Sequence, residues 1–227
     1  MKYRIMGDNL QMALVELAQN EKVYAEAGAM NHMSGNMVME ARARGGLMSG
    51  LKRKLMNETF FVTEFYPSGG SGYVAFRGNV PGKIMPVEIA PGKEFIVQKD
   101  AFLAAEDSVN LEITFQRRLG SGFFGGEGFI LEKLTGQGTA FINAAGDFVE
   151  YVLQPGQQVK VSTGCVVGFE PTVHFDIQTV GGLKTMFFGG EGVFVTILTG
   201  PGRIVLQSMT IGNLAMAIYP FLPRTNQ

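Results

Sequence analysis

The chain has 227 residues, of which 46% are hydrophobic and 17% are charged, and no apolar run approaches the roughly 18 residues of a transmembrane helix. These values exclude a disordered chain and a protein that spans a membrane with helices. The 19 basic and 20 acidic residues nearly balance, so the overall charge selects neither nucleic acid nor an anionic membrane as a partner.

The N-terminal residues predict a strand and no targeting segment. Residues 2–8 resemble the strand that closes each of the repeated units described below, and neither an apolar nor an Arg- and Ser-rich leader precedes them. The single cysteine, Cys165, cannot form an internal disulfide and fits a reducing compartment. We therefore expect a cytoplasmic protein.

The rest of the chain is predicted to repeat one unit three times. The box Phe123–Gly128 recurs 64 residues later as Phe187–Gly192, and Leu134–Gly138 recurs at the same offset. A weaker first copy lies 72 residues before the second, and the offset falls to 69 after a three-residue insertion within residues 42–57. The predicted organisation is one compact domain, 1–227, with repeats at 10–78, 82–145 and 147–208 and a C-terminal extension at 209–227.

Each unit shows the period of two that is typical of half-buried strands. Val109, Leu111 and Ile113 share one face, and residues 173–177 repeat this alternation. Residues 10–17 have a helix-like pattern, but their equivalence to segments of the second and third units favours a strand. Glycine, with 31 residues at about twice its usual share, is assigned to the repeated hairpin turns.

These patterns predict an all-β protein of three tandem β-sandwich repeats in a pseudo-threefold arrangement. Such packing would cover strand edges that otherwise promote aggregation. A linear array of three independent sandwiches is the alternative, and the short connections between the units disfavour it.

Residues that could carry catalysis are scarce. Gly120–Gly125 matches the dinucleotide fingerprint G-x-G-x-x-G, but a predicted strand follows where that motif requires a helix. His174 and Asp176 share one face of a predicted strand without a nucleophile that the sequence places near them, which favours a solvated surface. Cys165 aligns with alanines of the other units, as expected of an inert core thiol. We expect no catalytic residue, no cofactor and no metal, and hence a protein that is not an enzyme.

One acidic residue recurs in every unit. Glu58, Glu127 and Glu191 each stand at the start of a predicted strand. Two roles remain open: the carboxylates accept backbone N–H groups of the adjoining turns, or they ring an axis and bind a cation. One carboxylate per unit provides few metal ligands, so we favour the structural role.

The segments before these glutamates combine cations with large apolar side chains. They contain eight of the 19 basic residues. Apolar residues at loop tips indicate contact with a partner, unless the Phe pairs simply begin core strands. The candidate interaction residues are Arg42, Arg44, Leu47, Met48, Leu51, Lys52, Arg53, Lys54, Arg117, Arg118, Phe123, Phe124, Lys184, Met186, Phe187 and Phe188.

Three motifs together resemble a known family. They are the Phe-Phe-Gly-Gly-Glu-Gly box, the Leu-Thr-Gly-x-Gly segment that follows it, and the basic stretch that begins at Gly45. The chain is similar over nearly its whole length to the family named for altered inheritance of mitochondria, number twenty-four. The resemblance implies three modules like those of the tryptophan RNA-binding attenuation protein (TRAP), and a role in mitochondrial biogenesis for the eukaryotic branch. It brings no catalytic residues.

We therefore expect a non-enzymatic oligomeric scaffold or interaction protein, a bacterial or archaeal relative of the mitochondrial factor. The expected partners are another copy of the chain, a different protein or an anionic membrane surface, with nucleic acid the least favoured. The alternative is a module that binds RNA or a small ligand in clefts between strands.

Overall fold

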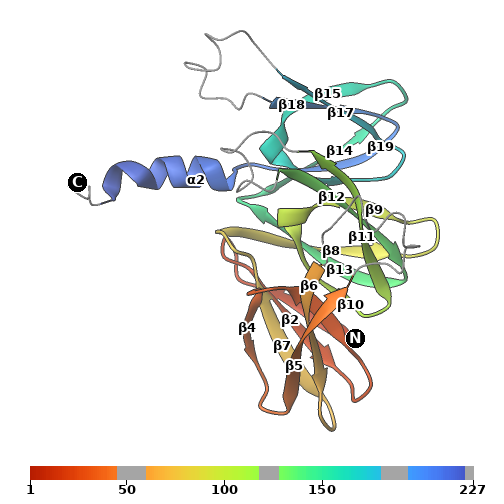
Figure 1. Ribbon diagram of the computed structural model, residues 1–227, viewed down its shortest axis with the longest axis vertical. Coiled ribbons are helices and arrows are strands. Elements are labelled where there is room, and N and C mark those ends of the chain that lie inside the picture. Colours follow the sequence, from red (N-terminus) through yellow and green to blue (C-terminus); the bar gives the residue numbers. More distant parts are fainter. Residues whose placement is uncertain (45–59, 118–127, 180–193, 223–227) are drawn as a thin grey trace.

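The computed structural model describes residues 1–44, 60–117, 128–179 and 194–222. Within these ranges the chain is built almost entirely of strands, which confirms the expected all-β class (Figure 1). The first thirteen strands are β1 (Lys2–Met6), β2 (Met12–Leu17), β3 (Val23–Glu26), β4 (Met30–Met33), β5 (Met37–Arg44), β6 (Phe60–Pro67), β7 (Gly72–Arg77), β8 (Gly82–Ile89), β9 (Phe95–Gln98), β10 (Phe102–Glu106), β11 (Val109–Arg117), β12 (Phe129–Gly136) and β13 (Gly138–Ala145). They are followed by β14 (Phe148–Leu153), β15 (Gln158–Ser162), β16 (Val166–Phe169), β17 (His174–Thr179), β18 (Phe194–Thr199) and β19 (Gly202–Gln207).

Short helices complete the described chain. Two 3-10 turns, η2 (Lys99–Ala101) and η4 (Thr163–Cys165), connect strands, while α2 (Ile211–Ile218) and η5 (Tyr219–Phe221) follow the last strand. The segment 10–17 forms β2, as expected from its equivalents. The helix within the C-terminal extension was not predicted.

The strand pairing follows one recurring order. In each of three successive groups (β2–β7, β8–β13 and β14–β19), the first and third strands pair with the sixth, and the second and fourth pair with the fifth. The registers recur as well: Ala25, Val97 and Val161 of the second strands lie opposite Thr63, Glu132 and Thr196 of the fifth. β1 adds an outer strand to the first group by pairing with β2.

Neighbouring groups are joined by continuous sheets. β10 pairs with β3 and β16 pairs with β9, so the third strand of one group extends the sheet of the group before it. The backbones approach closely at the second join, because a Cβ on Gly168 would overlap the Phe95 ring and lie 2.5 Å from the Ile96 carbonyl oxygen. Glycine is therefore required there.

The buried core also crosses these joins. One cluster combines Tyr24 of β3 with Val109 of β11 and Val167 of β16, and the Tyr24 hydroxyl donates a hydrogen bond of 3.0 Å to the Val109 carbonyl. A second cluster combines the first group with Leu103 and Phe141 of the second group. Because apolar contacts and hydrogen bonds cross each boundary, the groups support one another's folding.

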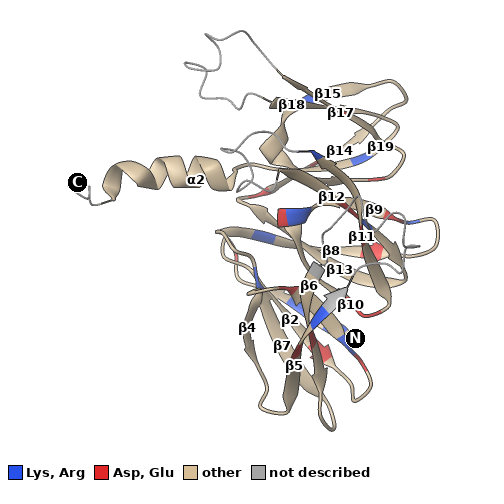
Figure 2. Cartoon of the chain, viewed as in Figure 1, with Lys and Arg blue, Asp and Glu red and all other residues tan. Residues whose placement is uncertain are grey.

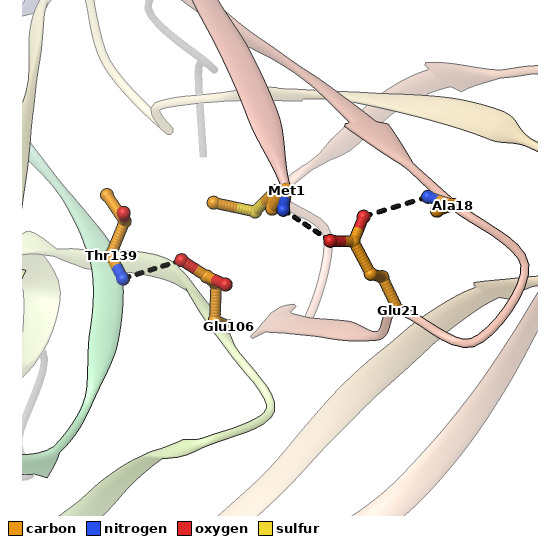
Figure 3. A network of polar contacts seen from close by, with 5 residues as sticks. All are labelled: Met1, Ala18, Glu21, Glu106 and Thr139. Carbon is orange, nitrogen blue, oxygen red and sulfur yellow. Dashed lines mark hydrogen bonds and ion pairs between the residues drawn. The ribbon is translucent and has the colours of Figure 1, made fainter.

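A recurring polar contact fixes the start of each sixth strand. Its backbone N–H donates to a side chain at or just beyond the end of the third strand: Tyr73 to Ser34 Oγ at 3.1 Å, Thr139 to Glu106 Oε1 at 2.8 Å, and Arg203 to Glu170 Oε2 at 2.9 Å. Figure 3 shows the Glu106 contact.

The same view shows how the N-terminal strand is held. The Met1 amino group donates to Glu21, whose other oxygen accepts the Ala18 N–H at 2.8 Å (Figure 3). These bonds, that of the amino group above all, lower the pKa of Glu21.

Candidate interaction surfaces

Most of the candidate loop residues lie outside the described part of the chain. Of the set defined from sequence, Arg42, Arg44 and Arg117 are described. The residues outside it are Leu47, Met48, Leu51, Lys52, Arg53, Lys54, Arg118, Phe123, Phe124, Lys184, Met186, Phe187 and Phe188, together with the repeated acids Glu58, Glu127 and Glu191 and the glycine motif 120–125.

Arg42 makes contacts within its own sheet. Arg42 of β5 forms ion pairs with Glu40 at 3.1 Å and Glu64 at 3.5 Å. Glu40 also accepts a hydrogen bond from Tyr66, and this bond, more than Arg42, lowers the pKa of the Glu40 carboxyl. The charge of Arg42 is therefore partly neutralised within its own sheet.

Arg117 and Arg44 end their strands. The Arg117 Nη1 donates to the Ile177 carbonyl at 2.9 Å, which connects β11 with β17 of the following group. Arg44 lies opposite Phe60 in the β5–β6 ladder. Figure 2 shows the described Lys and Arg distributed along the molecule rather than gathered over one element.

The three most exposed large apolar side chains of the described residues lie in the C-terminal segment, residues 211–222. Met216, Tyr219 and Phe221 are 76%, 73% and 85% exposed. No residue of α2 or η5 is buried, and the segment contains no charged side chain. Figure 1 shows α2 standing out sideways from the stacked sheets.

The helix begins at a capping box. The Thr210 Oγ1 accepts the Asn213 N–H at 3.0 Å, and the Asn213 side-chain oxygen accepts the Thr210 N–H at 3.1 Å. Thr210 directly before an apolar run is the signal in the sequence that indicates such a helix start. The all-β interpretation of the repeats did not extend to residues after 208, so this surface was missed.

A buried carboxyl lies beside the second join, where Val97 is paired with both Glu132 and Gly168. Glu132 of β12 is 2% exposed, and its Oε2 is the one fully buried side-chain polar atom without a hydrogen-bond partner among the described residues. Burial, and secondly the charge of Glu26, raise its pKa to about 8, so it is neutral at pH 7.

The other groups considered for chemistry occupy ordinary positions. His174 and Asp176 are exposed on β17, where Asp176 Oδ2 accepts a hydrogen bond from Gln178. Burial raises the pKa of the Cys165 thiol, and a hydrogen bond from Ser162 only partly opposes this, so the thiolate is disfavoured.

The described residues contain neither a metal-type cluster nor a membrane-spanning helix. No group of three His, Cys, Asp or Glu side chains within the described ranges is arranged as a metal site would require. None of the helices in those ranges has the length and apolar character to cross a membrane.

Comparisons with known proteins agree with the fold. The family model described as mitochondrial biogenesis AIM24 matches residues 3–209. The crystal structure of a Streptococcus pyogenes protein is similar with a TM-score of 0.78 and 22% identity, covering 97% of this chain and 99% of that one. At this identity the likeness shows the fold alone. A comparison with curated proteins gave no match.

Proposed function

We propose a function for this chain from the premise that it belongs to the mitochondrial biogenesis AIM24 family, as the motifs of its sequence predicted. The function is that of a self-assembling scaffold: a non-enzymatic protein that binds further copies of itself. We place it in the cytoplasm, on the ground that a reducing compartment fits its one partly buried thiol, Cys165.

The module arrangement is part of this proposal. Each six-strand group corresponds to one TRAP-like β-sandwich module, and the same third-to-second-strand pairing relates each module to the next. The pseudo-threefold arrangement expected from the sequence would result if the same strand pairing also joined the first module to the third. In the single chain the two outermost members of the series, β4 and β15, lie at opposite ends of the molecule (Figure 1), which leaves the arrangement open.

One observation carries the self-association, namely the apolar C-terminal segment that stands away from the body. A fully exposed Phe or Met side chain forgoes about 1.5–3 kcal/mol of burial, so a segment with several of them gains stability from a covering surface. Aromatic residues and methionine are also the types enriched at protein interfaces.

A second copy fits this segment better than an anionic membrane. Helices that bind at membrane surfaces carry Lys and Arg on their polar face, whereas residues 211–222 contain none. The described basic residues lie elsewhere along the body (Figure 2). An uncharged apolar segment is the kind of surface that packs against an equally apolar one.

Size-exclusion chromatography with light scattering tests the proposal. The intact chain, with a protomer of 24.6 kDa, should elute as an oligomer. The double variant Met216→Ser/Phe221→Ser should elute at lower mass with an unchanged β circular dichroism spectrum. The matched control is Val152→Ser, which alters a side chain that is 71% exposed on β14 and should leave the mass unchanged.

Three outcomes would contradict the proposal. A monomeric intact chain would overturn it, and an unchanged mass in the double variant would remove the C-terminal segment from it. Flotation of the chain with phosphatidylserine/phosphatidylcholine vesicles, abolished by the double variant, would assign the segment to a membrane instead.

A further inference from the structure

Two strands, β4 and β15, end the series of sheets that the joins connect. From them we derive an inference that rests on the proposed self-association and identifies a contact between copies. We infer that β4 of one copy pairs in antiparallel fashion with β15 of another copy, so that copies join head to tail. This contact is separate from the C-terminal segment.

The two joins within the chain are the template for this contact. In both, the third strand of one group pairs with the second strand of the group before it: Ala104 lies opposite Ala25, and Gly168 lies opposite Val97. The second pair follows the first by 64 residues on one strand and 72 on the other, the offsets at which the sequence repeats. The same register has therefore formed twice in this chain.

A third strand and a second strand remain unused in this series. β4 is the third strand of the first group and ends its sheet, and β15 is the second strand of the last group and ends another. Among the described residues, neither has a strand on its outer side. Applying the repeat offsets places His32 opposite Val161 and Met33 opposite Lys160.

Backbone geometry leaves the outer edge of β4 free to pair. The Ser34 N–H donates inward to the Tyr73 carbonyl at 3.0 Å. Because hydrogen-bonding directions alternate along a strand, the Met33 N–H and C=O are directed outward. The bulge between Met30 and His32 matches those of β10 and β16, which pair successfully on their outer sides.

Burial differs between the internal joins and the two ends. Ala104 and Tyr24 are fully buried in the first join, whereas the equivalent residues at the ends, His32 and Lys160, are exposed. These two polar residues make the contact between copies weaker than the internal joins. A reversible contact between chains, rather than a permanent one, follows from this difference.

Within the described ranges, the outer edges of β4 and β15 do not pair with each other in one chain. β4 lies near the lower end of the molecule in Figure 1 and β15 near the upper end. A second copy is the partner whose edge has the matching register, and repeated joining extends the chain or closes a ring.

Cysteine cross-linking tests this register directly. In a Cys165→Ala background, which copies the alanines of the other repeats, one preparation carries His32→Cys and another carries Val161→Cys. After mixing and oxidation, a disulfide-linked pair of chains should form, because directly opposite residues of paired strands have Cα atoms about 5 Å apart. Mixing Met33→Cys with Lys160→Cys gives a second, independent pair in which neither altered residue is fully buried, since Met33 is partly buried and Lys160 is exposed.

The controls fix both register and direction. Mixing His32→Cys with Lys160→Cys should give little product, because these side chains point to opposite faces of the joined sheet. A single preparation that cross-links to itself would contradict head-to-tail joining.

The outcomes separate this inference from the proposed function. If the intact chain is oligomeric but neither opposite pair cross-links, the β4–β15 contact is wrong and the scaffold stands. If the intact chain is monomeric and nothing cross-links, both are wrong, and His32 and Lys160 cap the ends of the sheets.

Discussion

Glu132 differs in type from the residues at the equivalent positions of the other two groups, which are threonines. Thr63 and Thr196 occupy the same register in the first and last groups, and Thr196 donates a buried hydrogen bond of 3.1 Å to Thr163. In the middle group the positions of that pair hold Glu132 and Lys99. A neutral carboxyl with an unpartnered oxygen replaces a satisfied pair of hydroxyls. Sequence could predict the repeat equivalence but not the burial, because Glu132 stands directly before Lys133 and charged side chains are ordinarily expected at the surface.

The raised pKa of Glu132 predicts a pH-dependent stability. In the unfolded chain the group ionises near 4.5, and in the folded chain near 8, so the folded state retains a proton between these values. The free energy of unfolding therefore falls as pH rises from about 5 to 9, by up to about 5 kcal/mol from this group. In Glu132→Gln the free energy of unfolding should fall less over the same pH range. Urea unfolding at pH 5, 7 and 9 measures this, and parallel profiles for the two proteins would contradict the assignment.

At the scale of elements, the strand pairs β3–β10 and β9–β16 connect the neighbouring groups. The alternating pattern predicted strands and the repeats predicted their equivalence, but neither shows which strands of neighbouring units pair. The partners at the first join, Ala25 and Ala104, are far apart in sequence. The alternation of apolar and polar residues shows which face of a strand is buried, but not which strand pairs with each of its edges. The sequence does contain a size exchange: Val23 and Ala104 in the first join stand where Phe95 and Gly168 stand in the second.

This exchange predicts a compensating pair of substitutions. Gly168→Ala should lower the free energy of unfolding by about 2–3 kcal/mol, because its Cβ would overlap the Phe95 ring. Phe95→Val/Gly168→Ala, which copies the first join, should be destabilised by less than the sum of the two single changes. The control is Gly35→Ala, where a Cβ meets nothing within 4 Å, and its change should stay below about 0.5 kcal/mol.

Chemical denaturation of the unchanged chain, the two single variants, the double variant and the Gly35→Ala control provides the comparison. Strict additivity of the two single changes would show that Phe95 and Gly168 do not constrain each other. The join would then depend on backbone hydrogen bonds alone.

At the scale of the whole molecule, β4 and β15 each end a sheet among the described residues, and the C-terminal segment exposes large apolar side chains. The family and the all-β class could be predicted from repeated motifs, because these reflect turns and strand faces that are local in sequence. The exposed C-terminal segment and the unmatched ends could not, because exposure depends on what the rest of the fold leaves uncovered. A second copy would cover both features, and on this ground we propose an assembling role for the protein.

Sedimentation velocity of the intact, unmodified chain over a hundredfold range of concentration tests this assignment most directly. We predict species at multiples of the 24.6 kDa protomer, with the larger ones gaining population as concentration rises. A single species of 24.6 kDa at every concentration would contradict it.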